Sequence, residues 1–230
     1  MPSEPAEVPH YHGHRARLRA RFREAGGQGM PDYEILEILL SLAIPRRDVK
    51  PLAKDLIARF GSFAGVIAAP LDQIEAMDGM GEIAPTALKV VQEAALRLLK
   101  ADVAKRPVIS SWTALLDYCK ARLAREAREE VYVLYLDRKN VLMADEVHGK
   151  GTVDQAPLYI REVVKRALDH VASAVILVHN HPSGDPSPSR ADIEMTKDLA
   201  AALKTVGIAL HDHLVIGRQG HASFKSLGLL

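Results

Sequence analysis

The feature that most constrains the fold is a run of apolar residues that leads directly into a pair of histidines. Residues 174–178 (AVILV) are continuously apolar, which is typical of a strand buried on both faces of a sheet. His179 and His181 follow at the strand end, and both rings lie on the same side because side chains alternate along a strand. A loop rich in proline and serine then leads into a predicted helix. This sequence of elements predicts a sheet covered by helices.

The rest of the second half supports a mixed sheet. β-Branched and aromatic residues predict further strands, over residues 131–136, 141–147 and 208–216. Apolar residues at helical spacing predict helices, over residues 112–124, 160–170 and 191–205. The resulting order predicts an α/β (α+β) fold, in which a mixed sheet packs against helices.

The first half shows helical periodicity alone, from residue 14 to residue 99. The pattern breaks around residues 102–111, where Pro107 and a pair of serines indicate a linker. Residues 1–13 show no pattern and are expected to be a flexible tail. We therefore expect an all-α domain over residues 14–105 and a second domain over residues 107–230.

Composition excludes several classes of protein. The 230 residues are 48% hydrophobic and 26% charged, as in globular proteins, and no apolar run approaches a membrane span. The first residues lack the apolar segment of a secretory signal. The single cysteine, Cys119, excludes an intramolecular disulfide and a cysteine-rich zinc site, and it suits the cytoplasm. Any metal is therefore held by histidines and carboxylates.

The histidine pair has the spacing of a metal site. Two imidazoles one strand pleat apart are able to reach one ion, and Asp192 follows close enough in sequence to be a third ligand. Three such ligands leave a fourth position open for water, as in a catalytic zinc site. Ser189 and Asp192 also fit a helix cap, and the two interpretations are compatible.

The sequence resembles a known family at these residues. His179-Asn180-His181-Pro182 followed by Ser189-x-x-Asp192 is similar to the JAMM motif of MPN/JAB-domain zinc metalloproteases. The longer segments HNHPSGDPSPSRADIEMTK, VLYLDRKN and DHLVIG resemble the bacterial RadC-like family, over roughly residues 107–230. The resemblance implies an MPN/JAB-like, cytidine-deaminase-like domain, preceded by the helical region of that family.

The resemblance also implies roles for individual residues. His179, His181 and Asp192 bind Zn²⁺, and Ser189 stabilises the oxyanion of the tetrahedral intermediate. Asn180 stands where eukaryotic isopeptidases carry Ser or Thr, so the resemblance does not extend to their substrates.

A glutamate at the start of an earlier strand is the general base in JAMM enzymes. Glu129 and Glu130 both precede the strand expected over residues 131–136, and only one of them is able to face the metal. We prefer Glu129, because RadC-like sequences carry an acid there. Glu146 is a weaker alternative.

The helical half carries a possible nucleic-acid motif. Residues 78–81 (DGMG) and the helix after them resemble a helix-hairpin-helix, whose backbone N–H groups contact a phosphate in DNA-binding proteins. However, Asp78 and Glu82 repel phosphate.

The net charge of each half of the chain is also low: up to Arg106 there are 15 Lys and Arg against 14 Asp and Glu, and after it 15 against 15. Alternating arginines at residues 15–23 indicate either a solvated helix face or a basic docking strip.

These patterns support one hypothesis and two alternatives. The first is a zinc-dependent hydrolase that cleaves a peptide or isopeptide bond in a protein or peptide substrate. The alternatives are a repair-linked factor that contacts DNA through its helical domain, and a JAB scaffold without catalysis.

Other polar residues have weaker expectations. His211 and His213 are expected to be structural or to orient a ligand imidazole, and Asp185 is expected to form a turn.

Overall fold

The computed structural model describes residues 11–151 and 158–230. The chain divides into two compact units, Met1–Glu93 and Ala94–Leu230, and one helix continues across the division. The boundary therefore falls earlier than the linker that the sequence indicated at Pro107. Residues 1–10 of the expected tail lie outside the described residues, and the first helix begins at Tyr11.

Helices are the secondary structure of the described residues of the first unit, from Tyr11 onward. Its helices are α1 (Tyr11–Ala25), α2 (Asp32–Ala43), α3 (Lys50–Phe60), α4 (Phe63–Ala68), α5 (Leu71–Glu75) and the first part of α6 (Ile83–Val103). Buried side chains form one core, including Leu36, Leu40, Leu56, Ile74, Met80 and Leu88. Among the described residues, no helix combines the length and the apolar character needed to cross a membrane.

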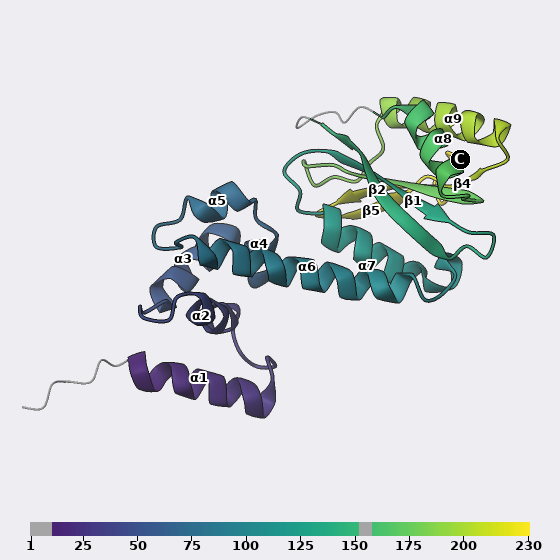
Figure 1. Cartoon of the computed structure of the whole chain (residues 1–230). Coiled ribbons are helices and arrows are strands. Elements are labelled where there is room, and N and C mark those ends of the chain that lie inside the picture. Colours follow the sequence, from purple (N-terminus) through teal and green to yellow (C-terminus); the bar gives the residue numbers. More distant parts are fainter. Residues whose placement is uncertain (1–10, 152–157) are drawn as a thin grey trace, which may run out of the picture. The chain divides into compact units, whose positions relative to one another are not determined.

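The second unit is a mixed sheet between helices (Figure 1). Its elements after α6 are η1 (Val108–Ser111), α7 (Trp112–Leu123), β1 (Glu130–Leu136), β2 (Leu142–Lys150), α8 (Ile160–Asp169), β3 (Ala174–Asn180), α9 (Arg190–Thr205), β4 (Ala209–Gly217) and β5 (Gly220–Ser223). The strand order is β2-β1-β3-β4-β5, and only the β3–β4 pair is parallel. This confirms the predicted mixed α/β architecture, to which the structure adds the short edge strand β5.

Helices cover both faces of the sheet, as Figure 1 shows. One face packs against α7 and the end of α6, in a core that includes Cys119 and the even-numbered apolar residues of β1 and β3. Cys119 is buried there, and burial raises the pKa of its thiol to about 12. The other face packs against α8 and α9 and includes the odd-numbered residues of the same strands.

The register of β1 and β3 places the histidine segment on this second face. The two strands are antiparallel, and Val131 lies opposite His179. Because Val131 belongs to the core under α8 and α9, the His179 ring lies on that side as well. The odd-numbered side chains at the end of β3 therefore face the start of α9.

Candidate metal centre

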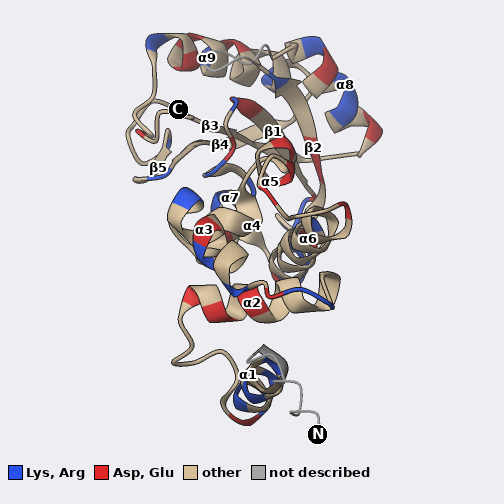
Figure 2. Cartoon of the chain, turned by 90° about the vertical axis from the view of Figure 1, so that its left-hand side faces the viewer, with Lys and Arg blue, Asp and Glu red and all other residues tan. Residues whose placement is uncertain are grey.

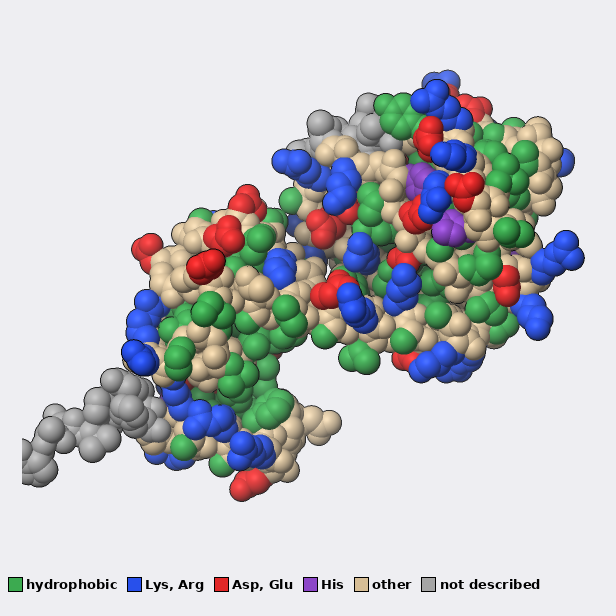
Figure 3. All heavy atoms as spheres, in the orientation of Figure 1, with side chains coloured by type: hydrophobic (Ala, Val, Ile, Leu, Met, Phe, Trp, Pro, Cys, Tyr) green, Lys and Arg blue, Asp and Glu red, His purple; other side chains and the backbone are tan. Residues whose placement is uncertain are grey.

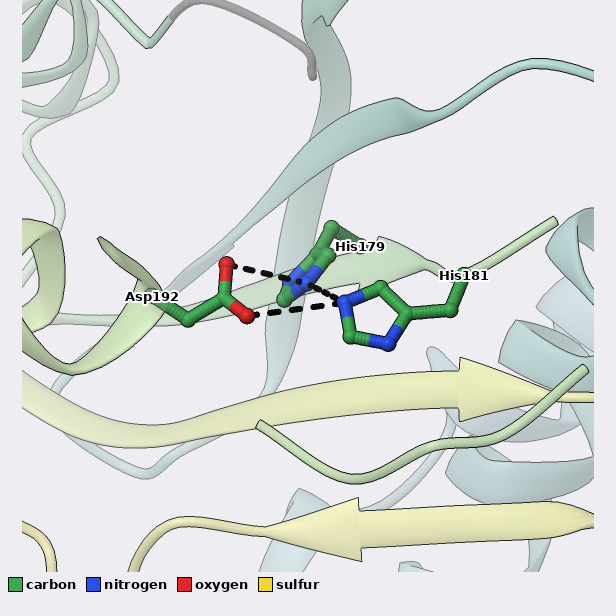
Figure 4. Close-up of side chains that lie close together, drawn as sticks. All are labelled: His179, His181 and Asp192. Carbon is green, nitrogen blue, oxygen red and sulfur yellow. Dashed lines mark hydrogen bonds and ion pairs between the residues drawn. The ribbon is translucent and has the colours of Figure 1, made fainter. Parts of the chain in front are cut away.

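Two histidines and an aspartate meet where β3 ends and α9 begins (Figure 4). The Nε2 atoms of His179 and His181 are 3.0 Å apart. Asp192 brings Oδ1 to 3.3 Å from His179 Nε2 and Oδ2 to 3.5 Å from His181 Nε2. His179 is 1% exposed, whereas the His181 side chain keeps 18% of its surface in solvent, so the group opens outward on the His181 side.

The hydrogen bonds of His181 favour a free Nε2. Its Nδ1 lies 2.9 Å from the backbone carbonyl of Asp185, which only accepts, so Nδ1 carries the proton. In the neutral ring, Nε2 then presents its lone pair to His179 and Asp192. Nitrogen lone pairs and a carboxylate that converge at these distances repel one another unless a proton or a metal ion lies between them. Two imidazoles and one carboxylate are also a donor set that zinc accepts, and this group could hold a metal ion.

Asp192 is held in place by the first turn of α9. Ser189 is the N-cap residue, and its Oγ accepts from the backbone N–H of Asp192 at 3.1 Å. In return, Asp192 Oδ2 accepts from the N–H and the hydroxyl of Ser189, both at 2.7 Å. The helix-cap interpretation of the Ser189-x-x-Asp192 pattern is therefore confirmed, and the cap orients the carboxylate towards the histidines, as the metal-ligand interpretation requires.

Charge within the group shifts two pKa values. Burial alone raises the pKa of the Asp192 carboxyl, but the two histidines outweigh burial and hold that pKa well below its usual range. The Asp192 carboxylate is the main cause of a raised pKa at His181, and the charge of Glu129 contributes in the same direction. The group thus favours a positive charge between its members.

A chain of hydrogen bonds supports His179 through Nδ1, the ring nitrogen that faces away from Asp192. His179 Nδ1 lies 2.7 Å from His213 Nε2, and His213 Nδ1 lies 2.6 Å from the Thr196 hydroxyl. Thr196 in turn donates to the backbone carbonyl of Asp192 at 2.5 Å. The His213 ring stacks on Phe224, with ring centroids 4.3 Å apart, and burial lowers its pKa well below the ordinary value. His213 thus contacts a predicted ligand imidazole, whereas His211 bonds to Asn140, 2.6 Å away.

The loop after His181 is packed against the end of β4. Gly184 approaches Gly217 so closely that a Cβ at Gly217 would lie 2.3 Å from the Gly184 carbonyl oxygen. Arg218 donates to the carbonyls of Pro182 and Ser183 at 3.0 and 3.3 Å. Asp185 forms the expected turn, in which its side chain accepts from Ser187. These contacts fix the carbonyl that orients His181.

Glu129 and Glu130 have different surroundings. Glu129 directly precedes β1, and its charge contributes to the raised pKa of His181. Glu130 lies on the α7 side, where its carboxylate forms an ion pair with Lys150 at 3.1 Å. The ion pair engages Glu130 away from the histidines, and the choice of Glu129 as the general base stays a prediction.

Asn180, which the sequence reasoning discussed only in relation to substrate, also has a supporting role that this reasoning did not predict. Its side chain is buried on the opposite face of β3, where Oδ1 accepts from the Glu130 N–H at 2.8 Å. Its Nδ2 donates to the carbonyls of Arg128, at 3.0 Å, and Glu126, at 3.4 Å. Asn180 therefore holds the backbone on both sides of Glu129. The sequence contained a signal for this position. Asn180 lies between two histidines on one strand, so its side chain has to point to the face of the sheet opposite to theirs.

Glu146 is engaged elsewhere on the same face. Arg166 donates to both of its carboxylate oxygens, and His170 Nε2 lies 2.8 Å from Oε1. The Arg166 hydrogen bonds are the main cause that lowers the pKa of this carboxyl to about 2. A carboxylate bound in this way is a weak proton acceptor.

Comparison with protein families agrees with this geometry. The model of the RadC-like JAB domain matches residues 109–229, which is over half of the chain. The protein therefore belongs to the RadC-like JAB domain family, as the motif residues predicted. The matched segment contains the five strands and the whole candidate metal centre.

Proposed function

We propose that the protein is a JAMM-type, zinc-dependent hydrolase that cleaves a peptide or isopeptide bond. The observation that carries the proposal is the convergence of His179 Nε2, His181 Nε2 and the Asp192 carboxylate beside solvent. His179, His181 and Asp192 would hold the ion, which leaves a position for water and substrate. When bound, zinc makes water more acidic and polarises a carbonyl.

The chain's own residues would move the protons and stabilise charge. Glu129 is proposed to accept the proton of the attacking water and to pass it to the leaving amine, because its charge acts on His181 whereas the Glu130 carboxylate is paired with Lys150. Ser189 is an exposed residue whose hydroxyl donates to Asp192 Oδ2, and this hydroxyl is proposed to turn its proton from Asp192 to the developing oxyanion. The substrate would be a protein or a peptide, and the single buried cysteine suits the reducing cytoplasm as its compartment.

Removal and return of zinc tests the proposed activity. The protein, loaded with one equivalent of zinc, is incubated with a peptide library and with isopeptide-linked peptides, and new amine termini are identified by mass spectrometry. We expect cleavage that a chelator abolishes and that added zinc restores, because the metal supplies the polarisation of the carbonyl. If zinc binds and no amide is cleaved, the non-catalytic scaffold becomes the better description.

A second candidate function is contact with DNA through the helical unit. The observation that favours it is Arg47, whose guanidinium donates to the Gly79 carbonyl at 2.7 Å and so brings a cation to the hairpin turn. Figure 2 also shows Lys and Arg concentrated on α1. Two of these arginines are engaged, however, since Arg15 donates to the Ile44 carbonyl and Arg21 pairs with Glu34.

Salt dependence of duplex binding tests this second candidate. We expect Arg47→Ala to weaken binding to duplexes of any sequence and to reduce the slope of log K against log salt by about 1, as loss of one phosphate contact does. Arg161→Ala in α8, which removes an exposed arginine of the other unit, is the matched control. Figure 3 shows acidic and basic side chains side by side on the visible face of that unit, so no effect is expected there. Equal slopes for wild type and Arg47→Ala would remove the hairpin from consideration.

A further inference from the structure

We propose that Thr196 and His213 form a relay that keeps the proton of His179 on Nδ1 and leaves Nε2 free for the metal ion. This inference rests on the proposed metal site. Thr196 and His213 are positioning residues, because they act through His179. They come from two elements: α9, which covers this face of the sheet, and β4, which pairs with β3.

The hydrogen bond from Thr196 to the backbone carbonyl of Asp192 sets the direction of the other hydrogen bonds in the relay. The backbone carbonyl of Asp192 only accepts hydrogen bonds, and the Thr196 hydroxyl lies 2.5 Å from it. The single proton of this hydroxyl is therefore donated to the carbonyl. It follows that the 2.6 Å contact between Thr196 and His213 is a bond donated by His213 Nδ1–H.

The buried environment of His213 decides which nitrogen of His179 carries the proton. The ring is 0% exposed, it stacks on Phe224, and its bonding partners are a hydroxyl and an imidazole, neither of which is negative. A ring in such a place is neutral, since an unpaired buried charge is costly. With its proton on Nδ1, His213 offers a lone pair at Nε2, which accepts from His179 Nδ1–H at 2.7 Å. The proton of His179 therefore lies away from His181 and Asp192.

Loss of the Thr196 hydroxyl reverses the arrangement. Without the hydroxyl, a proton on His213 Nδ1 has no acceptor. His213 is then more stable with its proton on Nε2, from which it donates to His179 Nδ1. The proton of His179 moves correspondingly from Nδ1 to Nε2, the atom that would bind the metal. Zinc then has to displace that proton before it binds, although no proposed ligand side chain has been changed.

The test compares two substitutions of Thr196 in the full chain. Thr196→Val keeps the shape of the side chain and removes the hydroxyl, and we expect zinc affinity, measured by competition with a chromophoric chelator, to fall about 10- to 100-fold. Thr196→Ser keeps the hydroxyl and is expected to bind zinc as the wild type does. Melting temperatures of the metal-free variants establish that both are folded. A purely structural role would not separate folded variants by their hydroxyl.

A spectroscopic measurement decides the question without any variant. Long-range proton–nitrogen correlation spectra of wild-type protein are expected to show His213 protonated on Nδ1 alone. Protonation on Nε2, or zinc binding by Thr196→Val with wild-type affinity, would overturn the relay. Failure of wild-type protein to bind zinc would contradict the proposed function instead, and the state of His213 is still read from the metal-free protein.

Discussion

Combined replacement of His179 and His181 by alanine is expected to remove bound zinc from the protein. Elemental analysis of the wild type supplied with zinc at neutral pH should give about one zinc per chain, and the double variant should give almost none. The two substitutions delete both proposed nitrogen ligands and leave a single carboxylate, which binds zinc weakly. A matched double variant, His211→Ala with His221→Ala, removes two histidines outside the group and should keep its zinc.

The other outcomes of this measurement are also informative. Zinc retained by the His179→Ala/His181→Ala variant would place the metal elsewhere in the chain. No zinc in the wild type would turn the interpretation towards a binding scaffold, and the helical unit would become the place to look for function. A thermal melt of each variant separates loss of zinc from loss of folding, since His179 also bonds to His213.

The fold and the metal group were predictable because their signals are local. Residues 174–178 form a buried strand whatever packs on them, and the alternation of side chains is sufficient to bring His179 and His181 to one side. The cap formed by Ser189 is equally local, and it places Asp192 in the first turn of α9. The edge strand β5, by contrast, has four residues and no alternating pattern, so its pairing with β4 depends on tertiary structure.

The supporting residues required contacts between distant segments. Thr196 is one helical turn after Asp192, which signals a shared helix face, but its partner His213 lies on β4 and is brought there by sheet pairing. The choice between Glu129 and Glu130 likewise depends on the register of β1 against β3. A sequence motif identifies which residue types are present, whereas register decides which of two neighbours faces the site.

Replacement of Glu129 by glutamine is expected to abolish most of the turnover and to leave zinc content unchanged. The substitution keeps the size of the side chain and removes its ability to accept a proton, and loss of a general base typically costs about 10²- to 10⁴-fold in rate. Glu129 is outside the His179, His181 and Asp192 group, so the metal content should equal that of the wild type. Turnover is measured on the amide substrate found in the library experiment, and zinc by elemental analysis of the same samples.

Glu130→Gln is the comparison that makes this prediction specific. The two glutamates are adjacent, but the Glu130 carboxylate pairs with Lys150 on the other face of the sheet. We expect its loss to affect stability by about 1 kcal/mol or less, as for other solvent-accessible ion pairs, and to leave the rate close to that of the wild type. A fall in turnover for Glu130→Gln with normal turnover for Glu129→Gln would reverse the assignment. Equal turnover in all three proteins would show that the proton is accepted by a group other than these two carboxylates.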